Sequence, residues 1–125
     1  MYEHLKLLPR EPLPHPERRL AELLLGQQGW RIVQGGQVDC LEVELTFESP
    51  KETIMFLMFL DDLQTQAQHH ASFSLQNFQT LKLQVFTHEP QPGISELDLA
   101  FAVLVSAFRT DQRRSPSARK FLNEN

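Results

Sequence analysis

Three histidines occupy positions in this sequence where a proton-transfer site could form. His69 and His70 are adjacent and follow a helical segment, and His88 stands at the end of an alternating strand pattern. Histidine is the side chain best suited to exchange protons near neutral pH, and sites are usually built at the ends of elements. Asp98 follows at the start of another helical segment. These residues are the candidate group for acid–base chemistry, although a surface or capping role is the alternative for any one histidine.

A zinc site made by the histidines is one alternative to proton transfer. Adjacent residues in an extended segment point to opposite sides, so His69 and His70 would not readily bind one ion together. The sequence has no two histidines four residues apart and no pair of cysteines. Its one cysteine, Cys40, begins an alternating strand without an activating motif, which disfavours a thiol nucleophile. We therefore expect no metal ion and no covalent catalysis by cysteine.

The elements that must position the histidines follow from the hydrophobic pattern. Residues 16–28 have apolar positions on roughly one helical face, and Gly29 ends the helix. Residues 30–33 form a short predicted strand, which a turn at Gly35-Gly36 joins to the next one. Residues 41–47 alternate apolar and polar side chains, as in a half-buried antiparallel strand. The first part of the chain is therefore predicted as a helix followed by a hairpin.

The second part of the chain repeats this order. A helix begins at Ser49-Pro50, because serine can cap it, proline suits the first position and Glu52 completes a capping box. Residues 73–77 and 80–88 are predicted as two further strands, and Ser95–Asp98 opens the last helix with capping-box spacing. Strand pairs with helices between them favour an α+β fold, in which helices cover one face of an antiparallel sheet.

Two of the predicted helices are more apolar than one buried face requires. Ile54–Leu60 is an unbroken apolar run, and Leu97–Val105 is nearly all apolar. A helix lying on one sheet needs only about half of such positions to be apolar. A second buried face is implied, and a contact between subunits is the expected source in so small a domain. The alternative is a helix overpacked with core residues.

Length and composition limit the class of protein. The 125 residues fit one domain, with 41% hydrophobic and 22% charged residues as in soluble globular proteins. We expect an extended lead-in over 1–15, a domain over 16–109 and a polar, mobile tail over 110–125. The net charge of -4 argues against a nucleic-acid partner, and the basic tail is too short to change this. One cysteine, no signal peptide and no membrane-spanning stretch predict a cytoplasmic protein.

The order and spacing of the histidines resemble the signature of the pterin-4a-carbinolamine dehydratases. In that family a His-His pair is followed by an aromatic residue and by a histidine within Thr-His, and an aspartate closes the motif. This chain has, in that order, His69-His70, Phe78, Thr87-His88 and Asp98. The resemblance covers roughly residues 20–108. It departs from the family pattern where an acidic residue, a proline and a further acidic residue are replaced by Thr65, Ala71 and Ser72.

The resemblance implies a four-stranded antiparallel sheet with three helices on one face, assembled into homodimers or homotetramers. It also implies dehydration of 4a-hydroxytetrahydropterin to quinonoid dihydropterin, a step of tetrahydrobiopterin recycling that needs no cofactor or metal. His69 and His88 would be the acid–base pair, and His70 would help to bind the pterin. Asp98, near His88, would orient an imidazole.

The resemblance leaves two functions open. Phe78 would shape the pocket or the core rather than act in catalysis, and Thr65 could offer only a hydrogen bond in place of the family's carboxylate. Some relatives act through protein binding, as a dimerisation cofactor for a homeodomain transcription factor or as assembly factors for RuBisCO. The second hypothesis is therefore a catalytically impaired member that binds a protein partner. The retained histidines favour the enzyme, whereas the changes at Thr65, Ala71 and Ser72 favour the binding protein.

Overall fold

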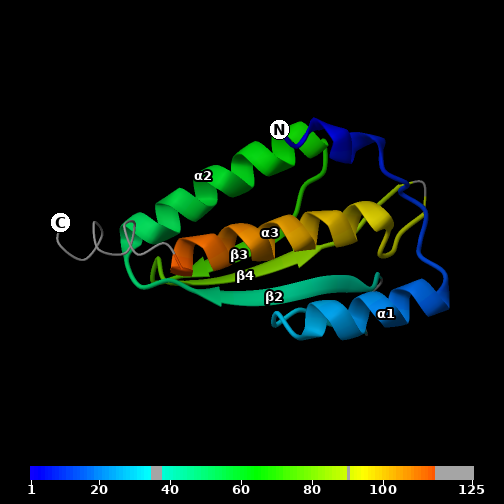
Figure 1. Cartoon of the computed structure of the whole chain (residues 1–125), viewed down its shortest axis with the longest axis horizontal. Coiled ribbons are helices and arrows are strands. Elements are labelled where there is room, and N and C mark those ends of the chain that lie inside the picture. The colour runs from blue at the N-terminus through cyan, green and yellow to red at the C-terminus, as the bar shows by residue number, and fades with distance from the viewer. Residues whose placement is uncertain (35–37, 90, 115–125) are drawn as a thin grey trace.

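The computed structural model describes residues 1–34, 38–89 and 91–114, and its three α-helices lie on one face of an antiparallel sheet (Figure 1). The elements in chain order are the 3-10 helix η1 (Glu3–Leu7), α1 (His15–Gly26), β1 (Arg31–Val33), β2 (Cys40–Thr46), α2 (Pro50–Ala67), β3 (Ser72–Gln76), β4 (Thr80–Val85) and α3 (Glu96–Arg114). The four strands have the order β1-β2-β4-β3, and each neighbouring pair is antiparallel. This arrangement confirms the predicted α+β fold.

The central strands β2 and β4 put their apolar side chains on the helix-facing side of the sheet. Leu41 lies opposite Val85 and Val43 lies opposite Leu83, and all four are buried. The alternate positions are polar and face away from the helices, as the alternation in the sequence predicted. The predicted turn at Gly35-Gly36 lies outside the described residues.

Helix α2 begins where the sequence predicted. The Ser49 hydroxyl accepts a hydrogen bond from the backbone N–H of Glu52 (3.1 Å), and Pro50 occupies the first helical position. A serine cap of this kind contributes about 1 kcal/mol to stability. The helix then crosses the sheet beside α3, which lies between α2 and α1 (Figure 1).

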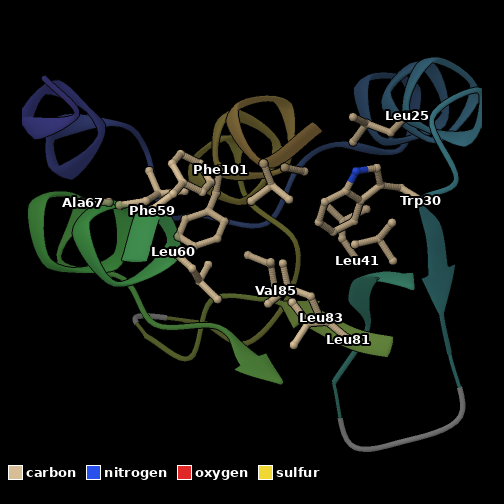
Figure 2. Close-up of a cluster of buried hydrophobic side chains, with 14 of the residues drawn as sticks. Leu25, Trp30, Leu41, Phe59, Leu60, Ala67, Leu81, Leu83, Val85 and Phe101 are labelled. Atoms are coloured by element: carbon tan, nitrogen blue, oxygen red, sulfur yellow. The ribbon is translucent and has the colours of Figure 1, made fainter. Parts of the chain in front are cut away.

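The hydrophobic core fills the space between the helices and the sheet. Figure 2 shows Leu60 from α2 and Phe101 from α3 directed toward β4 side chains such as Leu83. Trp30 is 3% exposed, and its indole N–H donates to the Ser106 hydroxyl of α3 (2.7 Å). Burial of one side chain such as Phe101 contributes about 1.5–3 kcal/mol. The core therefore fixes the ends of α2 and α3 relative to the sheet.

The apolar run of α2 has a second face that the described residues leave exposed. Ile54, Met55 and Met58 are 47%, 42% and 68% exposed, whereas Phe56 and Leu60 from the same run are buried. The run is thus not simply an overpacked core helix. No helix in the described ranges combines the length and the apolar character that a bilayer-spanning segment needs.

The other two helices differ from their predictions. On α1 only Leu25 is buried, because this helix meets just the short β1 and the edge of α3. The rest of its predicted apolar face is exposed, at Leu20, Leu23 and Leu24. Much of the apolar excess of α3 is buried within the chain, at Leu97, Phe101, Ala102 and Val105, because α3 lies between two helices over the sheet. Val103 of the same run is 53% exposed.

Both chain ends contain more structure than the sequence predicted. The segment predicted as an extended lead-in includes η1, which buries Leu5 (1% exposed), and the Tyr2 ring packs on Phe59 of α2. Helix α3 continues to Arg114, so residues 110–114 are helical where a polar tail was predicted. The helix persists because Arg109 forms a buried ion pair with Glu52 of α2. Residues 115–125 of the predicted tail lie outside the described part of the chain.

Candidate active site

His69 and Asp98 form a buried pair at the point where α2 ends and α3 begins. Nε2 of His69 lies 2.6 Å from Oδ1 of Asp98. The two side chains are 6% and 0% exposed. A hydrogen bond to an ionised partner is stronger than a neutral one, and burial keeps water from competing for it. The pair therefore fixes the His69 ring in one orientation.

The second carboxylate oxygen of Asp98 is saturated with donors. Oδ2 accepts hydrogen bonds from the Thr87 hydroxyl (2.8 Å) and from the backbone N–H of Ser95 (2.8 Å). The Ser95 hydroxyl lies 3.1 Å from the same oxygen and 2.8 Å from the Thr87 hydroxyl. With Oδ2 occupied by these donors, Oδ1 is the oxygen that faces His69. As a carboxylate oxygen it accepts the hydrogen bond, and Nε2–H of His69 donates it.

This assignment leaves Nδ1 of His69 as the nitrogen with a free lone pair. Nδ1 has no hydrogen-bond partner among the described residues. In that same part of the chain, no fully buried side-chain nitrogen or oxygen lacks a partner. Nδ1 is therefore not fully enclosed by the described residues, although the His69 side chain as a whole is 6% exposed. In the neutral ring this nitrogen can accept a proton while Asp98 stabilises the cation that forms.

The loop between β4 and α3 delivers the donors to Asp98. Thr87 and Gly93 exchange two backbone hydrogen bonds of 2.8 and 3.0 Å, which close the loop into a narrow turn. Ser95 then stands before the first turn of α3, and Asp98 three residues later reaches back to its N–H. This is the reciprocal half of the capping box predicted for Ser95–Asp98. The local helix start thus creates the buried anion of the site.

The end of α2 delivers His69. Gln68 adopts a left-handed conformation (φ 52°) immediately after the helix, and its N–H is directed to Thr65 O. The N–H of His69 donates to the carbonyl of Gln64 (3.2 Å). These bonds form a Schellman motif, which reverses the chain direction at a helix end. The turn aims His69 back under the helices toward α3.

Two residues that the sequence analysis did not single out also hold this turn. The Oε1 atom of Gln64 accepts a hydrogen bond from the N–H of Ala71 (2.8 Å). The Arg10 guanidinium donates to the carbonyls of Ala67 and Gln68 at 3.4 Å each. No sequence signal marks either contact, because each depends on the path of the chain after the helix has ended.

The other two histidines, His70 and His88, are exposed and lie at the same end of the neighbouring strands β3 and β4. In the β3–β4 register Ser72 lies opposite Gln84, so the start of β3 and the end of β4 coincide. His70 comes just before β3, and His88 comes just after β4. The His88 ring packs against Phe86 with centroids 4.4 Å apart. Thr87 connects His88 to the buried network, because its hydroxyl binds Asp98.

The structure specifies the surroundings of two predicted site residues. Asp98, expected near His88 to orient an imidazole, bonds to the imidazole of His69, and Thr87 next to His88 binds its other oxygen. Phe78 is 45% exposed at the β3–β4 turn, and its carbonyl accepts from the Thr53 hydroxyl in the first turn of α2 (2.8 Å). An α-helix of 18 residues is about 27 Å long, so Phe78 lies far from His69, which follows the last turn.

The side chains of Thr65 and Cys40 form no hydrogen bond with the site residues in the described part of the chain. The Thr65 side chain is exposed on the last turn of α2, where the family pattern has a carboxylate. Cys40 is buried, and its burial together with the nearby carboxylates of Glu42 and Asp39 raises the pKa of the thiol. A raised pKa disfavours the thiolate, which is the nucleophilic form. Within the described ranges, no three His, Cys, Asp or Glu residues are grouped as a metal site requires.

Comparison with known families identifies the chain. A family model described as pterin 4 alpha carbinolamine dehydratase matches residues 13–108, which is more than half of the sequence. The chain belongs to this family. This confirms the resemblance noted in the histidine pattern. The dehydratase match begins after Arg10, so η1 and the contacts of Arg10 lie outside it.

A solved structure supports the fold of this family member. The chain is similar to the crystal structure of a transcriptional coactivator/pterin dehydratase from Brucella melitensis, with a TM-score of 0.66 and 21% sequence identity. The similarity covers 78% of this chain and 97% of that one. Sequence comparison with curated proteins finds no match.

Proposed function

We propose that this protein dehydrates a 4a-hydroxytetrahydropterin to the quinonoid dihydropterin, as a step in pterin recycling. The observation that carries the proposal is the buried His69–Asp98 pair in a chain of the dehydratase family. The pair gives one imidazole a fixed orientation and an accessible basic nitrogen. A dehydration needs such a group, because a proton must leave the substrate in step with the departing hydroxyl.

In the proposed reaction His69 and His88 share the two proton transfers. One histidine takes the proton from the ring nitrogen beside the hydroxylated carbon, and the electron pair forms the new carbon–nitrogen double bond. The other gives a proton to the hydroxyl, which leaves as water. The orientation of His69 by Asp98 supports a role as base through Nδ1. The exposed ring of His88 at the same sheet edge supports the role of acid.

The remaining site residues have smaller roles in this proposal. His70 is exposed next to His69 and would help to bind the pterin. Thr65 would add at most a hydrogen bond from the last turn of α2. Phe78 is left out, because its place beside the start of α2 is incompatible with contact to a substrate held by His69.

A stopped-flow assay of 4a-hydroxytetrahydropterin dehydration tests the proposal. Wild-type protein should accelerate the reaction, and His69→Ala and His88→Ala should each lower kcat roughly 100-fold or more. His15→Ala is the matched control, because His15 begins α1 and has no role in the proposed proton transfers. If correctly folded wild-type protein does not accelerate the dehydration, the proposed enzymatic function is refuted.

The second candidate is a protein-binding member of the family with impaired catalysis. The uncovered apolar faces favour it: Leu20, Leu23 and Leu24 on α1 are each more than half exposed. The similar Brucella melitensis protein is described as a transcriptional coactivator as well as a pterin dehydratase. This candidate would be supported if wild-type protein does not catalyse the dehydration but binds a protein partner, and if Leu23→Asp abolishes that binding. Such a result would favour a dimerisation or assembly factor.

Self-association and location complete the proposal. The exposed α2 residues Ile54, Met55 and Met58 support a homodimer or homotetramer formed through this helix. A cytoplasmic location is supported by the buried, unpaired Cys40, which is typical of reducing compartments.

A further inference from the structure

The chain segment that carries His69 and His70 is held from both sides by one residue of α2. The main-chain carbonyl of Gln64 accepts from the N–H of His69 (3.2 Å). Its side-chain Oε1 accepts from the N–H of Ala71 (2.8 Å). The first N–H belongs to the first histidine of the pair, and the second belongs to the residue that directly follows the pair. Gln64 therefore brackets both histidines between two hydrogen bonds.

We propose that Gln64 is a positioning residue that sets the direction of the His69 and His70 side chains. The expected effect on catalysis rests on the proposed function. The two hydrogen bonds of Gln64 are independent of that function. The contact at Oε1 lies beyond the helix, and it fixes the peptide plane that leaves His70 toward β3. The contact at the carbonyl is part of the turn that sends His69 toward Asp98.

The backbone donor at residue 71 needs an acceptor. Ala71 follows the His-His pair and carries an N–H, which a proline at this position would lack. A part-buried backbone donor costs free energy when it has no partner. The side-chain Oε1 of Gln64 supplies that partner at 2.8 Å.

A neighbouring glutamine shows that the contact is specific to position 64. Gln66 stands on the same last turn of α2, but its side chain accepts from the N–H of Tyr2 and serves the N-terminal segment. Gln64 instead reaches forward along its own chain. The two glutamines therefore give a matched pair of substitutions on one helix turn, of which only one touches the histidine segment.

The test compares four variants of the full-length chain. Gln64→Met keeps the length of the side chain and removes the acceptor, and Gln64→Glu keeps an acceptor. Gln66→Met is the control. Because reaction rates fall steeply with sub-ångström misplacement, we expect Gln64→Met to lower kcat roughly 10-fold or more. Gln64→Glu should remain within about threefold of wild type, as should Gln66→Met.

The fourth variant, Ala71→Pro, removes the backbone N–H of residue 71 and introduces a proline ring. In this background Gln64→Met should have no further effect on kcat, which a double-mutant cycle would report as coupling between the two positions. If the losses of kcat caused by Gln64→Met and Ala71→Pro add up in the double variant, the pairing of Gln64 with Ala71 is wrong. If Ala71→Pro fails to fold, as judged by thermal melting, the single variants at 64 and 66 decide the matter.

An NMR readout separates this inference from the enzyme hypothesis. The Nε2 proton of His69, held against Asp98, should give a protected imidazole signal. Gln64→Met should shift or broaden that signal, and Gln66→Met should leave it unchanged. If wild-type protein has no dehydratase activity, the proposed function fails while the signal still tests Gln64. A Gln64→Met protein with wild-type signal and rate would overturn the inference.

Discussion

The side chains of His69 and Asp98 meet at 2.6 Å although the residues are 29 positions apart in the chain. The contact joins the turn after α2 to the first turn of α3. Asp98 is thereby shared between two tasks, since it also binds the N–H of Ser95 at the helix start. A change at Asp98 should affect both the orientation of the imidazole and the stability of α3.

Asp98→Asn should lower kcat by roughly 100-fold to 10,000-fold, the range over which loss of a correct histidine tautomer acts. The asparagine oxygen would accept from Thr87 and Ser95, which leaves its NH2 group facing Nε2 of His69. Nε2 must then accept, and the proton moves to Nδ1, the nitrogen that has to be basic. Stopped-flow rates and 15N shifts of the imidazole would measure both effects. A reversed tautomer with full activity would show that Nδ1 is not the base.

Arg109→Met should destabilise the fold by roughly 3–5 kcal/mol, because it leaves the buried carboxylate of Glu52 without its partner. The guanidinium also donates to the carbonyl of Thr46 (2.6 Å) and lies 4.6 Å from the Phe47 ring centre. The free energy of unfolding in urea measures the loss. The double variant Glu52→Gln with Arg109→Met should lose less than Arg109→Met alone. An equal loss would mean that the buried charge is not the cause.

Glu42 should make stability depend on pH in the acid range. Burial alone would raise its pKa, but hydrogen bonds from Gln84 and Arg31, with the charges of Arg31 and Lys82, hold the pKa below its ordinary value of 4.5. The unfolded chain therefore takes up this proton first as the pH falls. The stabilisation is complete above about pH 4.5 and is lost as the pH drops through the lower folded-state pKa.

Urea unfolding between about pH 6 and pH 3 measures this loss, and Glu42→Gln should flatten it. Glu44→Gln on the same strand is the control, because Glu44 is exposed and should leave the pH profile unchanged. A Glu42→Gln profile as steep as that of wild type would contradict the assignment.

Met58→Asp should weaken self-association roughly 10-fold to 100-fold if the exposed face of α2 is the subunit contact. Met58 is 68% exposed at the centre of that face, and a charge there would have to be buried on assembly. Light scattering over a concentration series gives the mass. Leu23→Asp, on α1, should leave the mass unchanged. A monomeric wild-type protein would contradict the interface on α2.

The sequence predicted those elements whose signals are local. The start of α2 depends on Ser49 and Glu52, which are three residues apart, and the β2 strand shows its buried face directly in its alternation. The capping-box spacing of Ser95 and Asp98 likewise predicted a helix start that the structure contains. Such features require no knowledge of where the rest of the chain lies.

The parts that could not be predicted depend on tertiary distances. Phe78 matches the aromatic position of the family signature in order along the chain, with one extra residue before it. The length of α2 nevertheless separates Phe78 from His69, and no pattern in the sequence states how the helix lies on the sheet. The extension of α3 to Arg114 depends on the distant Glu52. The partner of Asp98 likewise followed only from the turn at Gln68. Spacing selected the candidate site residues, and the fold shows which of them are in contact.

The network around Asp98 also has a bearing on how the protein reaches its native state. Its donors come from the turn after α2 and from the β4–α3 loop, and Asp98 itself stands in the first turn of α3. A partly folded chain that lacks any of these segments has no formed site. After dilution from urea, dehydration activity should therefore return no earlier than the burial of Trp30. The recovery of the dehydration rate would then report the time at which folding is complete.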